Sequence, residues 1–381
     1  MRSLCVLNVL LLTILLVPSG EAAEGEHLMY VGTYTGKGSN GIYGYRFDPA
    51  TGDVHSLGLA SRAENPSFLV ANPDGRLLFA VNELDTFQNE PTGAVSVFAV
   101  DRETGKVRLL QQVPSLGGGP AHVSLDRSGR FLMVANYGGG NVAVFPIGPD
   151  GRLGRHTAFM QAHGSSVNLK RQASPHAHSI QVTPDNRVAI VADLGIDKLL
   201  VYDFDERTGA LTADSLKVRT LEPGAGPRHV AIAPSGKCVY VVNELASSVT
   251  VFAFDEVQGS LEKKQTLLTL PGDFAGTNTA AEIIVDSQGK FLYVSNRGDN
   301  SIVVFSIDAG NGSLAAVQRI PCGGKTPRNI ALDPTGRWLF SANQNSDGIA
   351  LFRVGHDDGR LTATSRLIKV VSPVCVTFVS P

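Results

Sequence analysis

Apolar and polar positions alternate in short runs along most of the chain, and one such unit recurs six times. In the copy at 226–244, Val230 and Ile232 alternate with small or polar residues, a turn follows at 235–237, and an apolar run extends from Cys238 to Val242. Alternation, a glycine turn and a second β-rich run predict two antiparallel strands. The other copies lie at 65–83, 119–137, 175–194, 280–297 and 326–344.

The spacing of these copies predicts the architecture. Successive turn positions lie about 50 residues apart, which leaves room for two more strands and suits one four-stranded propeller blade per repeat. The turn positions are Gly75, Gly129, Asn186, Gly236, Gly289 and Gly336. A second turn, with the pattern Asp-x-x-Thr/Gln-Gly-x-Leu/Val, is expected between the two outer strands and begins at Asp48, Asp101, Asp205 and Asp255.

A seventh blade is predicted from the two ends of the chain. Segments 27–35, 41–47 and 54–60 supply three strands, while 372–378 matches the first half of the repeat and then stops. Pairing the terminal strands closes the ring and removes exposed sheet edges. The predicted fold is all-β: residues 24–381 form one seven-bladed β-propeller of four-stranded antiparallel blades, closed by N- and C-terminal strands in one blade.

Residues 1–23 have the pattern of an export signal. Arg2 precedes an apolar run from Leu4 to Val17, and Ala22 and Ala23 offer a cleavage site. The run is short for a transmembrane helix. We expect a cleaved signal peptide and a periplasmic or extracellular protein. The alternatives are a retained N-terminal anchor and, if the N-terminus is misread, a cytoplasmic protein.

Charge and cysteine content narrow the possible partners. A formal net charge of -2 gives no reason to expect nucleic acid or an anionic membrane surface as partner. Cys238, Cys322 and Cys375 are an odd, widely spaced set, which predicts buried free thiols rather than a disulfide framework or a metal site. No serine-hydrolase elbow, phosphate-binding loop or zinc motif is present in the sequence, so we expect no metal and no cofactor.

The repeat also predicts where a site could lie. The start of each first strand and the end of each second strand share one rim, which also carries the insertions 84–93, 159–174 and 271–279. Residues at equivalent positions differ in charge and shape, which indicates an asymmetric pocket at the axis. Before the turns, these positions are Ser67, Ala121, His178, Arg228, Ala281 and Arg328, with Val374 as the seventh. After the turns, they are Glu83, Tyr137, Leu194, Glu244, Arg297 and Gln344, with Thr33 as the expected seventh.

Several motifs, taken together, resemble a known family. They are PHAHS, GPRH, VVNELASSVTVF, AEI, VSNRGDNSIVVF and TPRN…ANQNSDGI. In combination they look like the seven-bladed propeller lactonases, which include bacterial 6-phosphogluconolactonases and a fungal carboxymuconate cycloisomerase. The similarity covers nearly all of the chain after the export signal. The cycloisomerase site is similar to a His, Arg, Glu, Arg set, which implies His178 or its neighbour His176, with Arg228, Glu244 and Arg297.

The resemblance implies hydrolysis of a sugar-acid lactone, most simply a 6-phosphogluconolactonase activity. His178 or Glu244 would take a proton from water, and Arg228 and Arg297 would stabilise the oxyanion or grip an anionic group. Arg328 is a further candidate anion clamp. Substrate hydroxyls would bind to side chains at the same rim, for which the candidates are His176, Asn243, Asn296, Asn329 and Gln344.

Other interpretations remain open at this stage. His122 and His229, one position deeper on their strands, are expected to be structural, and Glu244 with Arg228 could be a structural ion pair. The recurrent Asn positions, among them Asn243 and Asn296, also suit strand-end hydrogen bonding. As a whole, the chain could be a non-catalytic exported propeller that binds a ligand or protein, or a cofactor-free cycloisomerase. An export signal also conflicts with a substrate that is made in the cytoplasm.

Overall fold

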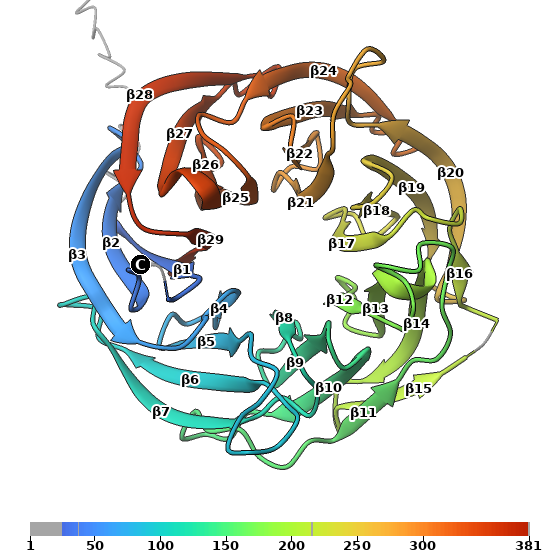
Figure 1. The fold of residues 1–381 in the computed structure, drawn as a ribbon, viewed down its shortest axis with the longest axis horizontal. Helices are drawn as coiled ribbons and strands as arrows, with labels where there is room; N and C mark the ends of the chain where they lie inside the picture. The colour runs from blue at the N-terminus through green and yellow to red at the C-terminus, as the bar shows by residue number, and fades with distance from the viewer. Residues whose placement is uncertain (1–24, 37, 215, 380–381) are drawn as a thin grey trace, which may run out of the picture.

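Seven twisted sheets surround a central axis, and the chain visits them in sequence order (Figure 1). The computed structural model describes residues 25–36, 38–214 and 216–379. Its sheets are antiparallel, with four strands in each and a short extra strand in one of them. The predicted all-β, seven-bladed propeller is confirmed. The predicted signal peptide at 1–23 lies outside the described residues.

Within each blade, the first-named strand lies next to the axis and the last-named strand lies at the outside of the ring. The N-terminal blade has β29 (Pro373–Val379), β1 (His27–Thr33), β2 (Gly41–Asp48) and β3 (Asp53–Arg62). The next two blades have β4 (Leu69–Ala71), β5 (Leu77–Asn82), β6 (Ala94–Val100) and β7 (Val107–Pro114), then β8 (Pro120–Leu125), β9 (Phe131–Asn136), β10 (Asn141–Pro146) and β11 (Ala158–Gln161).

The remaining blades follow the same order. The five-stranded sheet has β12 (Ala177–Val182), β13 (Val188–Asp193), β14 (Lys198–Asp205), β15 (Ala210–Ala213) and β16 (Arg219–Thr220), of which the last two both pair with β14. The last three have β17 (Pro227–Ile232), β18 (Cys238–Asn243), β19 (Ser248–Asp255) and β20 (Ser260–Leu268); β21 (Thr279–Val285), β22 (Phe291–Arg297), β23 (Ser301–Ile307) and β24 (Leu314–Pro321); and β25 (Pro327–Leu332), β26 (Trp338–Asn343), β27 (Gly348–Val354) and β28 (Leu361–Lys369).

The two ends of the chain share one blade, as the sequence predicts. Strand β29 pairs antiparallel with β1, from Leu28 opposite Val379 to Gly32 opposite Cys375. Figure 1 shows β29 next to β1 on the inner side of the blue sheet. Backbone hydrogen bonds between chain ends therefore close the ring, which leaves no gap between the first and last blades.

The apolar core lies between adjacent blades. Each of the second strands β9, β13, β18 and β26 is buried along its whole length, whereas in the outer strand β28 only Leu361 is buried and the other residues are partly buried or exposed. Where the last blade meets the first, the ring of Phe47 packs edge-on against Phe340 at 5.0 Å and against Trp338 at 6.3 Å. Cys238, Cys322 and Cys375 are buried free thiols, which confirms that prediction.

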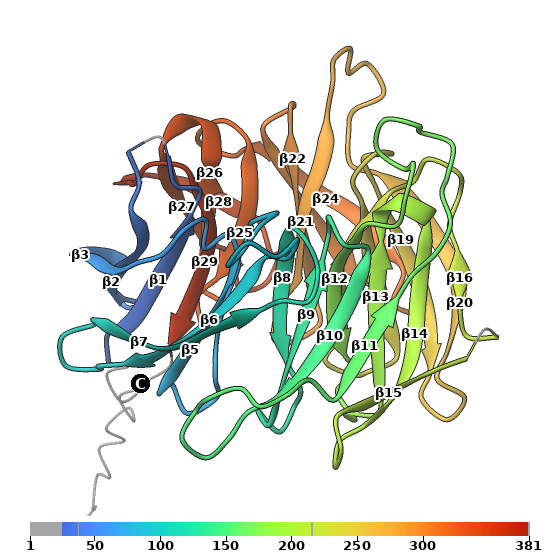
Figure 2. The same cartoon turned by 60° about the horizontal axis from the view of Figure 1, so that its bottom comes forward.

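Helix contributes very little to the described residues. The two helical segments are single 3-10 turns, η1 (Leu194–Ile196) and η2 (Gln344–Ser346), each directly after a second strand. Neither is long enough to cross a membrane, and the described residues contain no other candidate span. Loops, rather than helices, therefore shape the rim around the axis. Figure 2 shows the β11–β12 loop (green) and the β20–β21 loop (gold) rising from the same rim, where the sequence placed these insertions.

A β-bulge near the start of the first strand brings pairs of side chains to the axis. In β17, Pro227 pairs with Asn243 and His229 pairs with Val242, so Arg228 is an extra residue. The extra residue interrupts the alternation of side chains, so both Arg228 and His229 reach groups from other blades. Equivalent register shifts occur in β8, β12, β21 and β25. The axis therefore carries two successive layers of side chains.

Buried tyrosines link neighbouring blades. The hydroxyls of Tyr30, Tyr240 and Tyr293 each donate to a glycine carbonyl in the outer turn of the next blade, at 3.0 to 3.1 Å. The acceptors are Gly105, Gly312 and Gly359. Because both partners are shielded from water, losing one would leave the other without a hydrogen bond.

Replacing Tyr293 with Phe should lower the free energy of unfolding by about 1 to 2 kcal/mol, because the carbonyl of Gly359 would stay buried and unpaired. Chemical denaturation of the purified protein measures this. The matched control is Tyr43→Phe, since the Tyr43 hydroxyl only accepts an exposed 3.3 Å bond from the Asn40 amide. Equal destabilisation by both changes would contradict a specific role for the link between blades.

Candidate active site

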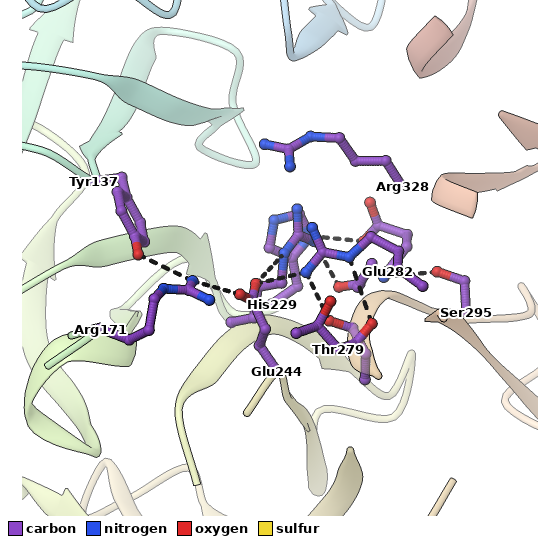
Figure 3. Close-up of polar contacts among 12 residues, drawn as sticks. Tyr137, Arg171, His229, Glu244, Thr279, Glu282, Ser295 and Arg328 are labelled. Carbon is purple, nitrogen blue, oxygen red and sulfur yellow. Dashed lines mark hydrogen bonds and ion pairs between the residues drawn. The ribbon is translucent and has the colours of Figure 1, made fainter. Parts of the chain in front are cut away.

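A single buried carboxylate forms the centre of the candidate site. Glu244 follows β18, and its side chain is only 4% exposed. Three guanidinium groups surround it: Arg171 at 2.6 Å, Arg297 at 2.8 Å and Arg228 at 3.2 Å. Figure 3 shows Arg171 between Tyr137 and Glu244. The structure thus brings together three of the four residues that the family resemblance implied, and adds Arg171.

The neighbouring arginines keep the Glu244 carboxylate ionised. Burial alone would raise the pKa of Glu244, but Arg297, Arg228 and Arg171 outweigh that effect and lower it to about 2. Burial, together with the charges of Arg297 and Arg328, lowers the pKa of Arg228 to about 9. Glu244 is therefore ionised at neutral pH. Both carboxylate oxygens of Glu244 are already engaged by guanidinium groups, and its role as general base stays a prediction.

Backbone carbonyls fix two of the arginines. Arg228 Nη1 donates to the Ala281 carbonyl at 2.6 Å, and Arg297 Nη2 donates to the Ala280 carbonyl at 3.2 Å. Both acceptors lie on β21, so the blade of β21–β24 supplies hydrogen bonds to groups that also neutralise Glu244. Ions that are buried this deeply need such additional hydrogen bonds to offset lost hydration.

The 159–174 insertion supplies the third arginine. Arg171 Nη2 donates both to Glu244 and, at 3.2 Å, to the hydroxyl of Tyr137. The side chain of Arg171 is 38% exposed, in contrast to that of Arg228 at 3%. Sequence reasoning identified this insertion as a functional loop but missed Arg171. Its position in the longest loop at the site rim was the signal available.

Asp197 ties this loop to the start of β17. Its carboxylate accepts hydrogen bonds from Ser166 Oγ at 2.5 Å and Gln172 Nε2 at 2.8 Å. It also accepts from the backbone amides of Gly224 at 2.7 Å and Gly226 at 2.6 Å. One buried carboxylate therefore fixes both the residue next to Arg171 and the turn that leads to Arg228.

A second charged group lies across the axis. The hydroxyl of Tyr34 donates to the carboxylate of Glu83 at 2.8 Å, and Arg328 lies 3.7 Å from that carboxylate and 5.1 Å above the Tyr34 ring. The predicted seventh rim position was wrong by one residue. Thr33 is fully buried and bonds to Ser39 and the Gly41 carbonyl. It pairs with Pro373 as Asn243 pairs with Pro227, so the equivalent of Glu244 is Tyr34.

His178 lies beside these charges in a cluster of aromatic rings. Its ring meets the edge of Tyr137 at 5.3 Å and of His229 at 5.1 Å, and its Nδ1 is buried without a hydrogen-bond partner. Burial, reinforced by the positive charge of Arg228, holds the pKa of His178 well below its usual range. His178 is therefore neutral at pH 7, as a proton acceptor must be.

His176 has a different environment at the rim. Its ring stacks on Tyr137 at 4.4 Å with an angle of 12° between the planes, and its Nδ1 lies 2.8 Å from the Tyr137 carbonyl. Its backbone amide donates to Asp193 at 2.7 Å. Of the two histidines that the PHAH motif offered, His176 thus supports Tyr137, while His178 lies deeper in the aromatic cluster.

A layer of polar and aromatic side chains lies one position deeper along the first strands. Phe68, His122, His229, Glu282 and Asn329 belong to it, and each is seven residues before its turn. His229 Nδ1 lies 2.7 Å from Glu282, and Asn329 donates to the same carboxylate at 2.7 Å. These residues also line a cavity of about 330 Å³ that extends toward Val285 and Leu332, near the opposite rim.

Most of the asparagines predicted to bind substrate hydroxyls form hydrogen bonds within the protein instead. Asn243 donates to Ser248 and Thr250, and Asn296 donates to the Thr269 carbonyl, which fits the alternative of strand-end hydrogen bonding. The Oδ1 of Asn329 accepts from the amide of Val376. Gln344 begins η2 at the rim, while Leu194, in η1, is fully buried. In the described residues, no group of three His, Cys, Asp or Glu side chains could hold a metal ion.

Known proteins match this fold and this sequence closely. The family described as "Lactonase, 7-bladed beta-propeller" matches residues 28–378. The chain belongs to this lactonase family. The 6-phosphogluconolactonase of Bacillus subtilis (strain 168) is 34% identical over 303 residues, which cover 80% of this chain and 84% of the relative. A protein of Formosa agariphila with the same name is 33% identical over 316 residues, covering 79% and 84%.

Solved structures support the same assignment. The periplasmic gluconolactonase of Pseudomonas aeruginosa is 35% identical, with a TM-score of 0.87, over 94% of this chain and all of the other. A protein of Lactobacillus plantarum is 33% identical with a TM-score of 0.86 over 93% and 99%. The prediction that the chain is a lactonase, and hence a carboxylic ester hydrolase, is thereby confirmed.

Replacing Glu244 with Gln should destabilise this lactonase by about 3 to 5 kcal/mol at pH 7, because three guanidiniums would lose their buried counter-ion. The loss should depend on pH. The pKa of Glu244 is about 2 in the fold and 4.5 ordinarily, so the stabilisation is fully present above pH 4.5 and is lost as pH falls toward 2.

The measurement is urea unfolding of both proteins at several pH values. The difference between wild type and Glu244→Gln should narrow as pH falls through this window. Other carboxylates titrate in both proteins, so their contributions cancel in the difference. A difference that stays constant across the window would show that the arginines do not stabilise the charged form of Glu244.

Proposed function

We propose that this chain hydrolyses 6-phosphogluconolactone, or a closely related sugar-acid lactone, at the rim where β12, β17 and β22 meet the 159–174 loop. The observation that carries the proposal is the cluster of Arg171, Arg228, Arg297 and Arg328 next to a neutral His178. The names of the Bacillus and Formosa relatives support this choice of substrate.

His178 would act as the general base. Its neutral imidazole accepts a proton from a water molecule while the water oxygen bonds to the lactone carbonyl carbon. The bond between that carbon and the ring oxygen then breaks, and the imidazolium returns the proton to the departing ring oxygen. The product is an open-chain hydroxy acid. Arg228 lies close enough to influence the pKa of His178 and would also disfavour a long-lived imidazolium.

The arginine cluster would stabilise the charge that develops on the carbonyl oxygen. Arg228 and Arg297 are fixed by backbone carbonyls and by Glu244 before any substrate arrives. Groups that are already oriented stabilise an oxyanion without further reorganisation. Glu244 would act as the anchor of these arginines rather than as the base.

The charge balance of the site favours an anionic substrate. Four guanidiniums face three carboxylates, those of Glu83, Glu244 and Glu282, which leaves one formal positive charge while His178 and His229 are neutral. A phosphate on the sugar, with a charge of about -1.5 to -2 at pH 7, would be attracted by this positive charge and would more than offset it. Arg328 and Arg171 are the candidates to bind it, since arginine recognises phosphate through paired hydrogen bonds.

An unphosphorylated gluconolactone is the second candidate substrate, and the Tyr34–Glu83 pair favours it. A carboxylate 3.7 Å from Arg328 would repel phosphate and accept hydrogen bonds from sugar hydroxyls. The structural similarity to a periplasmic gluconolactonase supports the same substrate. It also supports the proposal that residues 1–23 direct export, since an exported enzyme would not meet a substrate confined to the cytoplasm.

The first test is hydrolysis of 6-phosphogluconolactone and of glucono-δ-lactone by the purified protein, with spontaneous opening subtracted. The wild type should hydrolyse at least one of them, and a His178→Ala, Arg228→Ala double variant should lose at least 100-fold in kcat/KM. If neither protein exceeds the spontaneous rate, both substrates are wrong. The cofactor-free cycloisomerase and the non-catalytic binding propeller would then be the better interpretations.

Replacing Arg328 with Gln should separate the two substrates. If Arg328 binds phosphate, KM for 6-phosphogluconolactone should rise about 10- to 100-fold, as expected for a charge-assisted pair, with little change for glucono-δ-lactone. Arg207→Gln is the matched control, because Arg207 lies in an exposed turn and pairs only with Asp205 among the described contacts. Equal effects of Arg328→Gln on both substrates would exclude a phosphate-specific role.

A further inference from the structure

The deeper axial layer contains a carboxylate–histidine pair to which no role has been assigned. Glu282 and His229 are both buried, and Glu282 Oε1 lies 2.7 Å from His229 Nδ1. Burial alone would raise the pKa of Glu282, but His229 and neighbouring charges lower it, so the carboxylate is ionised. An ionised carboxylate can only accept hydrogen bonds. The proton of this contact must therefore sit on His229 Nδ1.

This arrangement fixes the state of the other ring nitrogen. Burial lowers the pKa of His229 more than Glu282 raises it, so the ring is neutral. With its proton on Nδ1, the Nε2 of His229 is a hydrogen-bond acceptor. That Nε2 is buried and has no partner. A buried acceptor without a donor is costly, which makes a nearby donor the expected complement.

His178 offers such a donor. Its Nδ1 is also buried without a partner, and the two rings have centroids 5.1 Å apart with 70° between their planes. At this separation, two ring nitrogens that face each other reach roughly the 2.9 Å of a normal hydrogen bond. A rotation of the rings that turns these two nitrogens toward each other would satisfy both unpaired atoms.

We propose that Glu282 and His229 are positioning residues that set the tautomer of His178. Glu282 accepts from His229 Nδ1–H, and His229 Nε2 accepts from His178 Nδ1–H. The Nε2 of His178 then carries the lone pair that the base needs. This inference rests on the proposed function only for the role of His178 as base, because the hydrogen-bond relay itself requires no substrate.

The hydrogen bonds that hold the Glu282 carboxylate in place are consistent with this role. Asn329 donates to Glu282 Oε2 at 2.7 Å, and its own Oδ1 is held by the amide of Val376 at 2.9 Å. The amide of Ile283 donates to Oε1 at 3.2 Å. Both oxygens of this carboxylate therefore face donors, so an amide in its place would face a donor at one end whichever way it turned. The tautomer of His229 would then no longer be fixed.

Nitrogen-15 NMR of histidine-labelled full-length protein tests the relay directly, because long-range proton–nitrogen spectra distinguish the two tautomers. The His178 signal is assigned by its loss in His178→Gln. In the wild type it should show the Nδ1–H tautomer at neutral pH, and in His229→Phe it should change toward Nε2–H. Phe68→Leu is the matched control, because the Phe68 ring also lies edge-on to His229, at 5.6 Å, but has no hydrogen-bonding group.

Kinetics then connect the relay to catalysis. His229→Phe should lower kcat for lactone hydrolysis about 100-fold or more, with KM little changed, whereas Phe68→Leu should stay near the wild type. If His229→Phe does not fold, as judged by circular dichroism, Glu282→Gln should give the same change of tautomer and the same loss of kcat.

The outcomes separate the two proposals. A wild-type His178 in the Nε2–H tautomer, or one unaffected by the change at His229 or Glu282, overturns the relay. The expected tautomers without any lactone hydrolysis would support the relay and overturn the proposed function instead. Loss of kcat in Phe68→Leu equal to that in His229→Phe would also contradict the relay, because a general disturbance of the layer would then explain both.

Discussion

The site depends on the neutralisation of one buried carboxylate by three guanidiniums. Glu244 comes from the end of β18, Arg228 from β17, Arg297 from β22 and Arg171 from the loop before β12. None of these groups could be buried alone without a large loss of hydration energy. Their mutual attraction therefore fixes four different parts of the chain around one point, and in the proposed function it orients positive charge before a substrate binds.

The propeller makes this convergence possible. Seven first strands start at the same rim, so residues far apart in the sequence meet at the axis (Figure 1). The bulge in β17 lets Arg228 enter the arginine cluster while the next residue, His229, enters the deeper layer. Two functions can thus be served by neighbouring residues of one strand: anchoring of charge at the rim and orientation of histidine rings beneath it.

The same architecture explains which parts of the site could be predicted from the sequence. His178, Arg228, Glu244 and Arg297 occupy repeated register positions, and the family resemblance implied the same set with His176 as the alternative to His178. Arg171 was missed because it belongs to an insertion, where the repeat gives no register. Tyr34 was missed in favour of Thr33 because β1 and its partner β29 come from opposite ends of the chain, so no turn precedes β1 from which to count.

The sequence alone determined the blade number, the strand order, the joining of both termini in one blade and the rim that carries the site. It could do so because alternation and the spacing of the turns are local properties that repeat. Only the tertiary structure decided the surroundings of the side chains, on which the proposed roles rest. Whether Glu244 is a base or an anchor, and whether His229 is inert or paired with Glu282, depends on burial and on charges from other blades, which determine the pKa values and the protonated atoms.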